Sequence, residues 1–311
     1  MERWPRREFL KRTAGAGLAS LVTSRLLGGA AAALPNPVGY AAISWPEGQY
    51  EHALDTMSSL GYKGVQSLGW VREKYGKRVE YLRDRLQSLK LKPVTLSCSD
   101  ANLAPEGPKD DVQQVQNYAS FFQQLGGLYL QITDGGKPRG NYSSEVIRQL
   151  GARMSLLGRI ANDHGLTLGY HPHAGTIGET REGIERILDA ADSQHVKLIV
   201  DVGHLVLSGV DPVEVLRTYR DRLLHLHVKD VRRDAAELAR KSPESVRDRD
   251  YVFCEVGAGV VDFGAVVKAL GEVGFKGWAI IELDGNEPLP GGPDASARLN
   301  KEGVEKLGFR V

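Results

Sequence analysis

The chain alternates short apolar segments with longer amphipathic ones along nearly all of its length after residue 33. This alternation constrains the fold more than any other feature, because strands and helices in strict succession favour a parallel sheet with helical crossovers. Eight apolar segments are predicted to be strands, namely Val38–Ile43, Gly64–Ser67, Lys92–Ser97, Gly127–Ile132, Leu166–His171, Lys197–Val202, Leu223–Val228 and Ala279–Leu283. Seven amphipathic segments are predicted to be helices, namely Tyr50–Leu60, Arg78–Leu89, Asp110–Leu125, Tyr142–His164, Thr180–Ala191, Pro212–Thr218 and Phe263–Val273.

This succession predicts a single (β/α)8 barrel, a fold that typically needs about 250 residues. Glycines such as Gly61 and Gly274 directly follow predicted helices, where they supply the left-handed residue that ends a helix. A doubly wound sheet is the alternative. Its phosphate-binding turn is missing, because the first strand leads into YAAISWPEG (Tyr40–Gly48) and no GxGxxG follows.

One long segment interrupts the alternation between the seventh and eighth strands. Val231–Gly259 is charged at first and then glycine-rich, and we predict it to be irregular. In a barrel this connection lies at the C-terminal ends of the strands, so it is either a lid over a site or a solvated excursion. Just beyond it, Asp262 is expected to be the N-cap of the following helix.

Residues 1–33 are predicted to be an export signal, which leaves 34–311 as the barrel. Arg6 and Arg7 are followed by Phe9 and Leu10, a pattern typical of twin-arginine signals. The apolar run Leu18–Ala33 is too short and too polar for a stable membrane span. We therefore expect a periplasmic or extracellular protein, with a disordered basic leader as the alternative.

Charge and cysteine content exclude several classes of protein. The formal net charge is +1, and without the basic residues 1–33 the chain is slightly acidic. Such a charge argues against a nucleic-acid partner. Cys98 and Cys254 stand in no CxxC spacing, which argues against a structural zinc module and against a disulfide scaffold.

Polar side chains gather at the ends of four consecutive predicted strands. In RLLHLHVKD (Arg222–Asp230), the period of two places His225, His227 and Lys229 on one face. The C-terminal ends of barrel strands meet at one mouth, although they are far apart in sequence. The candidates at this mouth are His171, His173, Asp201, His204, His225, His227, Lys229 and Glu282.

A metal ion accounts for this set better than core packing does. A buried carboxylate needs a partner, and a divalent cation shared with histidines is the natural one. Mixed imidazole and carboxylate ligands suit Mn, Co, Zn or Fe. We expect Asp201, His227 and Glu282 to bind the ion, with His171 as the fourth ligand. His173, His204 and His225 would then orient ligands or bind substrate hydroxyls.

The motifs around these residues resemble a known family. They are SLGYKGVQ (Ser59–Gln66), YHPHAGT (Tyr170–Thr176), DVGHLVLSGVDP (Asp201–Pro212), HLHVKDV (His225–Val231) and the long segment Gly257–Asp284. Together they resemble the sugar phosphate isomerase/epimerase superfamily, the xylose-isomerase-like barrels. Within it the chain is most similar to inosose dehydratase-like members.

The resemblance implies one catalytic divalent metal, Mn or Co being favoured, held by His171, Asp201, His227 and Glu282. It implies a lyase that dehydrates a keto-sugar or keto-inositol after α-proton abstraction through an enediolate. The alternatives are an epimerase or isomerase of keto-sugars or keto-glycosides, a 3-keto-glycoside lyase or hydratase, and a barrel that binds metal or sugar without turnover.

Individual roles follow as hypotheses. His171 or His173 would be an acid/base, and Lys229 or His204 a cationic donor to substrate oxygens. For Lys229 an ion pair with Asp230 or with a helix-end carboxylate is the alternative. Trp45 is predicted to contact substrate or to pack in the core. Glu255 is predicted to close over the substrate or to lie on a solvated rim.

The chain departs from the superfamily pattern at two positions. Many epimerases have Glu where this chain has His171, and the second strand ends in Gln66 where Glu is frequent. Apurinic endonucleases share the barrel, but their three-metal site needs histidines that are missing here. DNA repair is therefore excluded from the prediction.

Overall fold

The computed structural model describes residues 34–98, 111–135, 142–243, 252–284, 289 and 291–311. The predicted export signal, residues 1–33, lies outside the described residues, and so do residues 244–251 of the long segment before the last strand. Within the described part of the chain, no helix combines the length and apolarity needed to cross a membrane.

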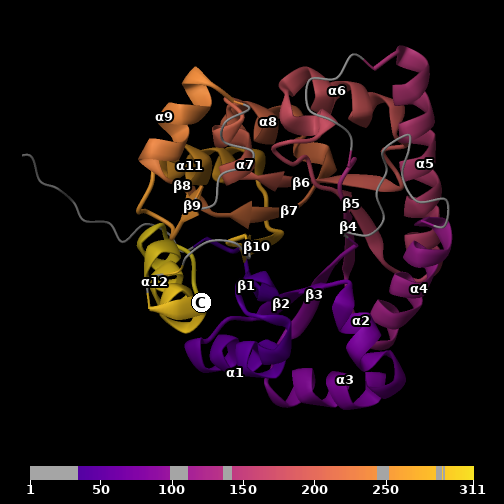
Figure 1. Cartoon of the computed structure of the whole chain (residues 1–311), viewed down its shortest axis with the longest axis vertical. Coiled ribbons are helices and arrows are strands. Elements are labelled where there is room, and N and C mark those ends of the chain that lie inside the picture. The colour runs from indigo at the N-terminus through magenta and orange to yellow at the C-terminus, as the bar shows by residue number, and fades with distance from the viewer. Residues whose placement is uncertain (1–33, 99–110, 136–141, 244–251, 285–288, 290) are drawn as a thin grey trace, which may run out of the picture. The chain divides into compact units, whose positions relative to one another are not determined.

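Eight parallel strands close into a barrel in the order β1-β10-β7-β6-β5-β4-β3-β2 (Figure 1). The prediction of a (β/α)8 barrel is confirmed, and the doubly wound alternative is wrong because β1 pairs with both β2 and β10. The strands are β1 (Val38–Ala41), β2 (Gly64–Leu68), β3 (Lys92–Ser97), β4 (Tyr129–Ile132), β5 (Thr167–Tyr170), β6 (Val196–Asp201), β7 (Leu223–Val228) and β10 (Trp278–Ile281).

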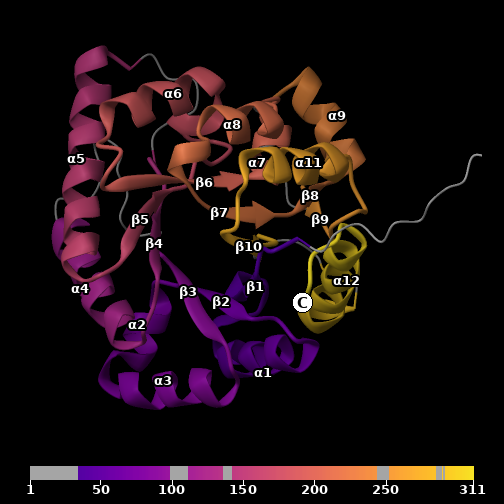
Figure 2. The same cartoon turned by 180° about the vertical axis from the view of Figure 1, so that it is seen from behind.

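The predicted helices form at the expected places around the strands (Figure 2). They are α1 (Tyr50–Leu60), α3 (Val79–Ser88), α4 (Asp111–Gln124), α5 (Ser144–Asp163), α6 (Arg181–Ala190), α8 (Pro212–Thr218) and α11 (Phe263–Val273). Four were not predicted: α2 (Trp70–Tyr75), α7 (Val202–Leu207), α9 (Arg233–Lys241) and α12 (Gly292–Lys306). Short 3-10 turns lie at Ala42–Ser44, Glu47–Gln49, Gly76–Arg78, Ile177–Glu179 and Arg220–Arg222.

Local capping explains where these helices begin and end. Gly61 and Gly274 adopt φ of 94° and 67° after α1 and α11, a conformation that glycine reaches without a steric penalty. The predicted N-cap role of Asp262 is confirmed, because its Oδ1 accepts from the backbone N–H of Ala265 at 2.9 Å. These caps explain why α11 begins and ends, and why α1 ends, at the predicted residues.

The prediction that Val231–Gly259 is irregular is wrong for the part that the structure describes. β8 (Asp230–Val231) pairs antiparallel with β9 (Phe253–Cys254), and α9 packs against them. Val231, Ala235 and Phe253 are buried in a small hydrophobic cluster of their own. The alternative of a solvated excursion is therefore wrong here, since an element with its own core is held to the barrel.

Helix α12 was missed because its buried face is made of small and polar residues apart from Val304. The fully buried residues of the helix include Ser296, Ala297 and Asn300. The sequence therefore lacks the apolar stripe by which an amphipathic helix is usually predicted. Hydrogen bonds attach the helix to the barrel. Asn300 Nδ2 donates to the hydroxyl of Tyr40 at 3.1 Å, and the Tyr62 hydroxyl donates to the carbonyl of Ala297 at 2.7 Å. The helix is thus held beside β1 by polar contacts.

Candidate metal centre

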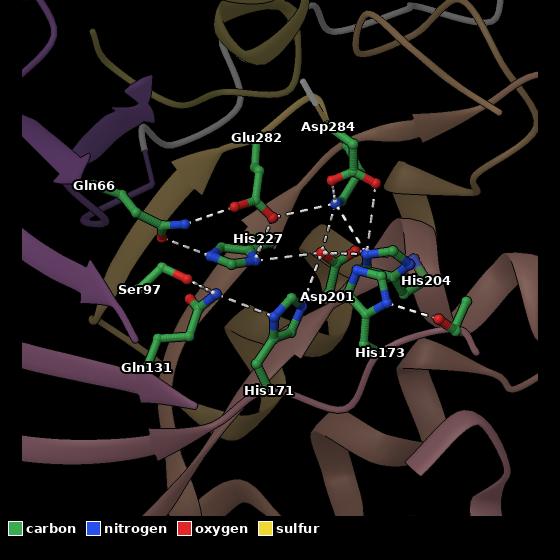
Figure 3. A network of polar contacts seen from close by, with 12 residues as sticks. Gln66, Ser97, Gln131, His171, His173, Asp201, His204, His227, Glu282 and Asp284 are labelled. Atoms are coloured by element: carbon green, nitrogen blue, oxygen red, sulfur yellow. Dashed lines mark hydrogen bonds and ion pairs between the residues drawn. The ribbon is translucent and has the colours of Figure 1, made fainter. Parts of the chain in front are cut away.

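Four strands deliver the predicted metal ligands to the C-terminal mouth of the barrel. His171 directly follows β5, Asp201 ends β6, His227 lies near the end of β7, and Glu282 directly follows β10. The register aligns them, since Asp201 pairs with His227 and His227 with Ile280, two residues before Glu282. Figure 3 shows the four side chains pointing toward one another.

The four side chains form a compact set of electron-rich atoms. One ligand atom from each of His171, Asp201, His227 and Glu282 lies within 4.8 Å of all the others, and all four residues are buried. Oδ2 of Asp201 lies 3.3 Å from both Nε2 of His171 and Nδ1 of His227. Oε2 of Glu282 lies 3.0 Å from Nδ1 of His227. This arrangement agrees with the predicted ligand set.

Gln66 determines which nitrogen of His227 faces the centre. Its Nε2 donates to Oε1 of Glu282 at 2.6 Å, because a carboxylate can only accept. The amide oxygen of Gln66 is therefore directed at Nε2 of His227, 2.7 Å away, and that nitrogen carries the hydrogen. Nδ1 of neutral His227 is left with its lone pair, and it has no hydrogen-bond partner among the described residues. The lone pair of Nδ1 faces two carboxylates, so a cation between them would be stabilised by all three groups.

The surroundings of the two histidine ligands perturb their pKa values in opposite directions. Burial lowers the pKa of His171 to about 4, although Asp201 opposes this effect. Burial also disfavours charge on His227, but the charges of Glu282 and Asp201 outweigh it and raise the pKa of His227 to about 9. His171 is therefore neutral at pH 7, whereas His227 without a metal ion attracts a proton to the centre.

Lys229 reaches the same carboxylates. Its Nζ lies 3.1 Å from Oδ2 of Asp201, 3.2 Å from Oε2 of Glu282 and 3.0 Å from Oδ1 of Asp284. Burial would lower the pKa of Lys229, but these three carboxylates outweigh it and raise the pKa above its ordinary value. The alternative of an ion pair with Asp230 is wrong, because none of these three carboxylates is that of Asp230. The alternative of an ion pair with a helix-end carboxylate is confirmed, because Asp201 is the N-cap of α7.

Counting formal charges tests whether a dication fits. Asp201, Glu282 and Asp284 contribute three negative charges, and Lys229 contributes one positive charge. With the histidines neutral, as they must be when they bind a metal ion, these groups leave two negative charges in a buried space, which is unfavourable without a counter-ion. One divalent cation would neutralise them. The donor set, two imidazole nitrogens and two carboxylates, is the mixed type that suits Mn, Co, Zn or Fe.

His204 and His173 lie beside this centre. His204 belongs to the first turn of α7 and not to a strand end, because the side chain of Asp201 caps that helix by accepting from the His204 N–H at 2.9 Å. His173 lies in the loop after β5, with Nδ1 2.7 Å from the carbonyl of Ala174. The two rings are 3.6 Å apart between centroids. Both predicted residues therefore adjoin the candidate metal ligands.

Asp230 organises the loop that follows β9. Its carboxylate accepts from the backbone N–H groups of Val231, Gly257, Gly259 and Val261 at 2.8 to 3.0 Å. Gly259 is required, because a Cβ there would lie 2.3 Å from Oδ1 of Asp230. The loop holds β9 against the barrel, and Phe253 of β9 contacts Lys229 and His204.

Three predicted substrate contacts lie elsewhere. Trp45 is in the core and donates from Nε1 to Asp294 at 2.8 Å, which agrees with the packing alternative. His225 lies deeper in the barrel, 3.2 Å from the hydroxyl of Thr95 and stacked on Tyr129. Glu255 lines a separate cavity of about 560 Å³ with Arg232, Arg233, Asp234, Glu237, Cys254 and Ala258. These positions do not support substrate contact at the metal centre.

Three residues of the centre were not predicted. Asp284 could have been predicted from the sequence, because it stands two residues after Glu282 and side chains two residues apart on an extended segment face the same way. Gln66 was noted only as a missing acid, although an amide can hold two ligands at once. Phe253 had no local pattern, since an aromatic residue in a charged segment says nothing about where its ring lies.

The fold and the centre together define a class of protein. A closed barrel of eight parallel strands, with ligand-type side chains from β5, β6, β7 and β10 at the C-terminal mouth, is a TIM barrel with its site in the usual place. A family model described as "Xylose isomerase-like TIM barrel" matches residues 54–305. The chain belongs to this family, and the resemblance predicted from the motifs is confirmed.

Individual relatives cover nearly the whole barrel. The inosose dehydratase of Clostridium beijerinckii is 27% identical over 291 residues, which are 88% of this chain and 96% of that protein. Two solved structures share the fold at 16% identity. One is the probable 3-DHS dehydratase AsbF of Bacillus anthracis, with a TM-score of 0.71 over 89% of this chain and 100% of that chain. The other is the IOLI protein with a binding zinc atom, with a TM-score of 0.70 over 88% and 98%.

Proposed function

We propose that this chain is a divalent-metal-dependent dehydratase that acts on a keto-sugar or keto-inositol. The enzyme class, a carbohydrate-acting lyase or isomerase, is what the names of its curated relatives indicate. The observation that carries the proposal is the set of four converging ligand atoms from His171, Asp201, His227 and Glu282. The names of relatives at 25 to 28% identity support the dehydratase outcome and a cyclitol-like substrate.

A metal ion held by these four residues would supply Lewis-acid polarisation of the substrate ketone and its neighbouring hydroxyl. That polarisation acidifies the proton α to the ketone, so that removing it leaves an enediolate. Mn²⁺ or Co²⁺ is our proposed ion, because both accept mixed nitrogen and oxygen ligands. The remaining chemistry belongs to side chains of the chain itself.

His173 is the proposed base. Its Nδ1–H donates to the carbonyl of Ala174, so Nε2 carries the lone pair that can take a proton. The residue is half-buried, unlike the fully buried His171, and can therefore meet a substrate entering the mouth. The proton taken by His173 can return to a β-hydroxyl, which then leaves as water.

Lys229 is the proposed cationic donor. Its buried ammonium already contacts three carboxylates and His204, so it would donate to a substrate oxygen by giving up one of these contacts as negative charge develops on that oxygen. Nε2 of His204 lies 3.2 Å from Nζ of Lys229 and accepts from it. His204 thereby orients the ammonium instead of donating charge itself. Of the two donors predicted, the contacts favour Lys229.

Metal dependence is tested with Asp201→Asn and Glu282→Gln. Each removes one anionic ligand at nearly constant shape, so we expect Mn²⁺ binding, measured by isothermal titration calorimetry, and activity to be lost together. Asp221→Asn and Glu182→Gln are matched controls, because these side chains are 90% and 81% exposed and pair with Arg220 and Arg186. If both site variants keep wild-type affinity and activity, the proposed centre is wrong.

The reaction is tested by incubating the enzyme with keto-inositols and 3-keto-glycosides in deuterium oxide with Mn²⁺ or Co²⁺. We expect loss of water and an absorbing enone or dione product. Deuterium incorporation without loss of water would favour the epimerase alternative. Metal binding with neither exchange nor product would favour a binding protein without turnover.

We further propose export by the twin-arginine route, a proposal that rests on the sequence of residues 6–10 alone. Cell fractionation is the test. Arg6→Lys combined with Arg7→Lys should keep the protein in the cytoplasm, because the route reads the arginine pair itself. An unchanged distribution would contradict the proposal.

A further inference from the structure

A second cluster of ligand-type side chains lies beside the proposed metal centre. One ligand atom from each of His173, His204 and Asp284 lies within 4.8 Å of the others. Nε2 of His204 is 3.9 Å from Oδ2 of Asp284. Nε2 of His204 is also 3.9 Å from Oδ2 of Asp201, so the second cluster directly adjoins the first. Two imidazoles and a carboxylate are a common ligand set for a divalent metal ion.

Both histidines present lone pairs to this cluster. The Nδ1–H of His173 is used by the carbonyl of Ala174, which leaves Nε2 as an acceptor. Nε2 of His204 accepts from Lys229 at 3.2 Å, so it too carries a lone pair. With the carboxylate of Asp284, the cluster has three electron-pair donors and no hydrogen to offer. Such a set binds a cation.

The cation already present is the ammonium of Lys229. It contacts two of the three members, Nε2 of His204 at 3.2 Å and Oδ1 of Asp284 at 3.0 Å. The ring of Phe253 covers it, with Nζ 4.5 Å from the ring centroid, which is a favourable distance for a cation over an aromatic face. Gly203 makes room for the lysine stem, because a Cβ there would lie 2.4 Å from Cγ of Lys229.

We propose that the ammonium of Lys229 takes the place of a second metal ion on His173, His204 and Asp284. The chain therefore holds one divalent cation, and Lys229→Met opens a second divalent-metal site. The inference rests on the proposed metal centre. It goes further by naming Lys229 as the residue that limits the number of bound metal ions to one.

The charges of the two clusters explain the exclusion. Asp201, Glu282 and Asp284 are balanced by one dication together with the ammonium. A second dication beside the ammonium would leave two uncompensated positive charges in a buried site, which Coulomb repulsion makes unfavourable. Without the lysine charge, one dication leaves one negative charge and three donors without a cation. A second dication then becomes favourable.

The test is metal stoichiometry. Wild-type protein and Lys229→Met are dialysed against Mn²⁺, and bound manganese is measured by mass spectrometry alongside electron paramagnetic resonance. Mn²⁺ is the suitable probe because it prefers nitrogen and oxygen ligands over the thioether that the substitution introduces. We expect one equivalent in the wild type and two in Lys229→Met, the latter with the broadened spectrum of two neighbouring Mn²⁺ ions.

Two further variants assign the second ion to its ligands. Lys229→Arg keeps the charge and should bind one equivalent. His173→Ala combined with Lys229→Met should return the stoichiometry to one. Two equivalents in the wild type, or one in a folded Lys229→Met, would overturn the inference. A wild type without any bound metal would instead refute the proposed function.

Asp284→Asn gives an independent measurement if Lys229→Met does not fold. The side chain of Asp284 is 31% exposed, so the substitution is tolerable. Without this carboxylate the ammonium depends on Asp201 and Glu282 and competes directly with the first metal ion. We expect affinity for Mn²⁺ to fall about tenfold, within the range seen for partners of metal ligands. Unchanged affinity would contradict the inference, and Asp262→Asn is the matched control.

Discussion

Single residues decide the chemistry of this centre through the partners that they hold in place. Gln66 illustrates this, because one amide contacts both His227 and Glu282. Lys229 is a second example, because its ammonium contacts three carboxylates and, together with one divalent cation, would neutralise them. Neither residue is a metal ligand, yet each determines what the ligands present to the mouth.

Gln66→Met should weaken metal binding by about 10- to 100-fold, as expected when a partner of two ligands is removed. The substitution keeps the length of the side chain but leaves Nε2 of His227 and Oε1 of Glu282 without their hydrogen bonds. The measurement is a competition titration with a metal-binding dye. Gln124→Met, at an exposed position of α4, is the control. Equal affinities for the two variants would show that Gln66 does not orient the ligands.

At the scale of elements, the insertion between β7 and β10 is held by one buried carboxylate. Asp230 accepts four backbone hydrogen bonds, three of them from the loop between Gly257 and Val261. This loop follows β9, which carries Phe253 against Lys229. The insertion is thus coupled to the centre through a short strand, and its attachment depends on Asp230.

Asp230→Ala should lower the free energy of unfolding by about 3 kcal/mol, because it removes the acceptor of four backbone N–H groups, one of them buried and three partly buried. Asp262→Ala is the matched comparison, since it removes only an exposed N-cap and should cost about 1 kcal/mol. Urea unfolding monitored by circular dichroism measures both. If Asp230→Ala lowers the free energy of unfolding no more than Asp262→Ala does, the four hydrogen bonds to Asp230 contribute little to stability.

At the scale of the whole barrel, α12 is joined to the first βα unit by a polar contact. The carboxylate of Asp294 accepts from Nε1 of Trp45 at 2.8 Å and lies 2.7 Å from Nε2 of His52. Partial burial raises the pKa of Asp294, but the hydrogen bonds from Trp45, His52 and Thr56 outweigh it, so the pKa lies below its ordinary value. Residues from the first and the last parts of the described barrel thus contact the same carboxylate, that of Asp294.

This contact predicts a pH dependence of stability. A carboxyl whose pKa is lower in the folded state stabilises the protein above the unfolded pKa of about 4, and the effect is lost as the pH falls through the folded value. Asp294→Asn should therefore be less stable than the wild type at pH 7, with a difference that shrinks toward pH 3. Urea unfolding across this range measures it, with Asp221→Asn as an exposed control. A constant difference would contradict the role of the charge.

Much of the barrel could be predicted, because helix and strand periods are local properties of the sequence. Helices α1, α8 and α11 agree with prediction at both ends, since a cap or a proline marks their limits. Helices α9 and α12 were missed for a physical reason. Apart from Val304, their buried faces consist of alanines, other small residues and Asn300, which do not form the apolar stripe expected of a core-facing helix.

The sequence by itself determined the barrel and the candidate ligands, because strand periodicity and the convergence of parallel strand ends are consequences of backbone geometry alone. Only the tertiary structure decided how those ligands are partnered. Gln66, Phe253 and Asp284 reach the centre from strands and loops far apart in the chain, and no local pattern encodes contacts of that kind. Charge balance, and with it the number of cations the mouth can hold, depends on which groups meet in space.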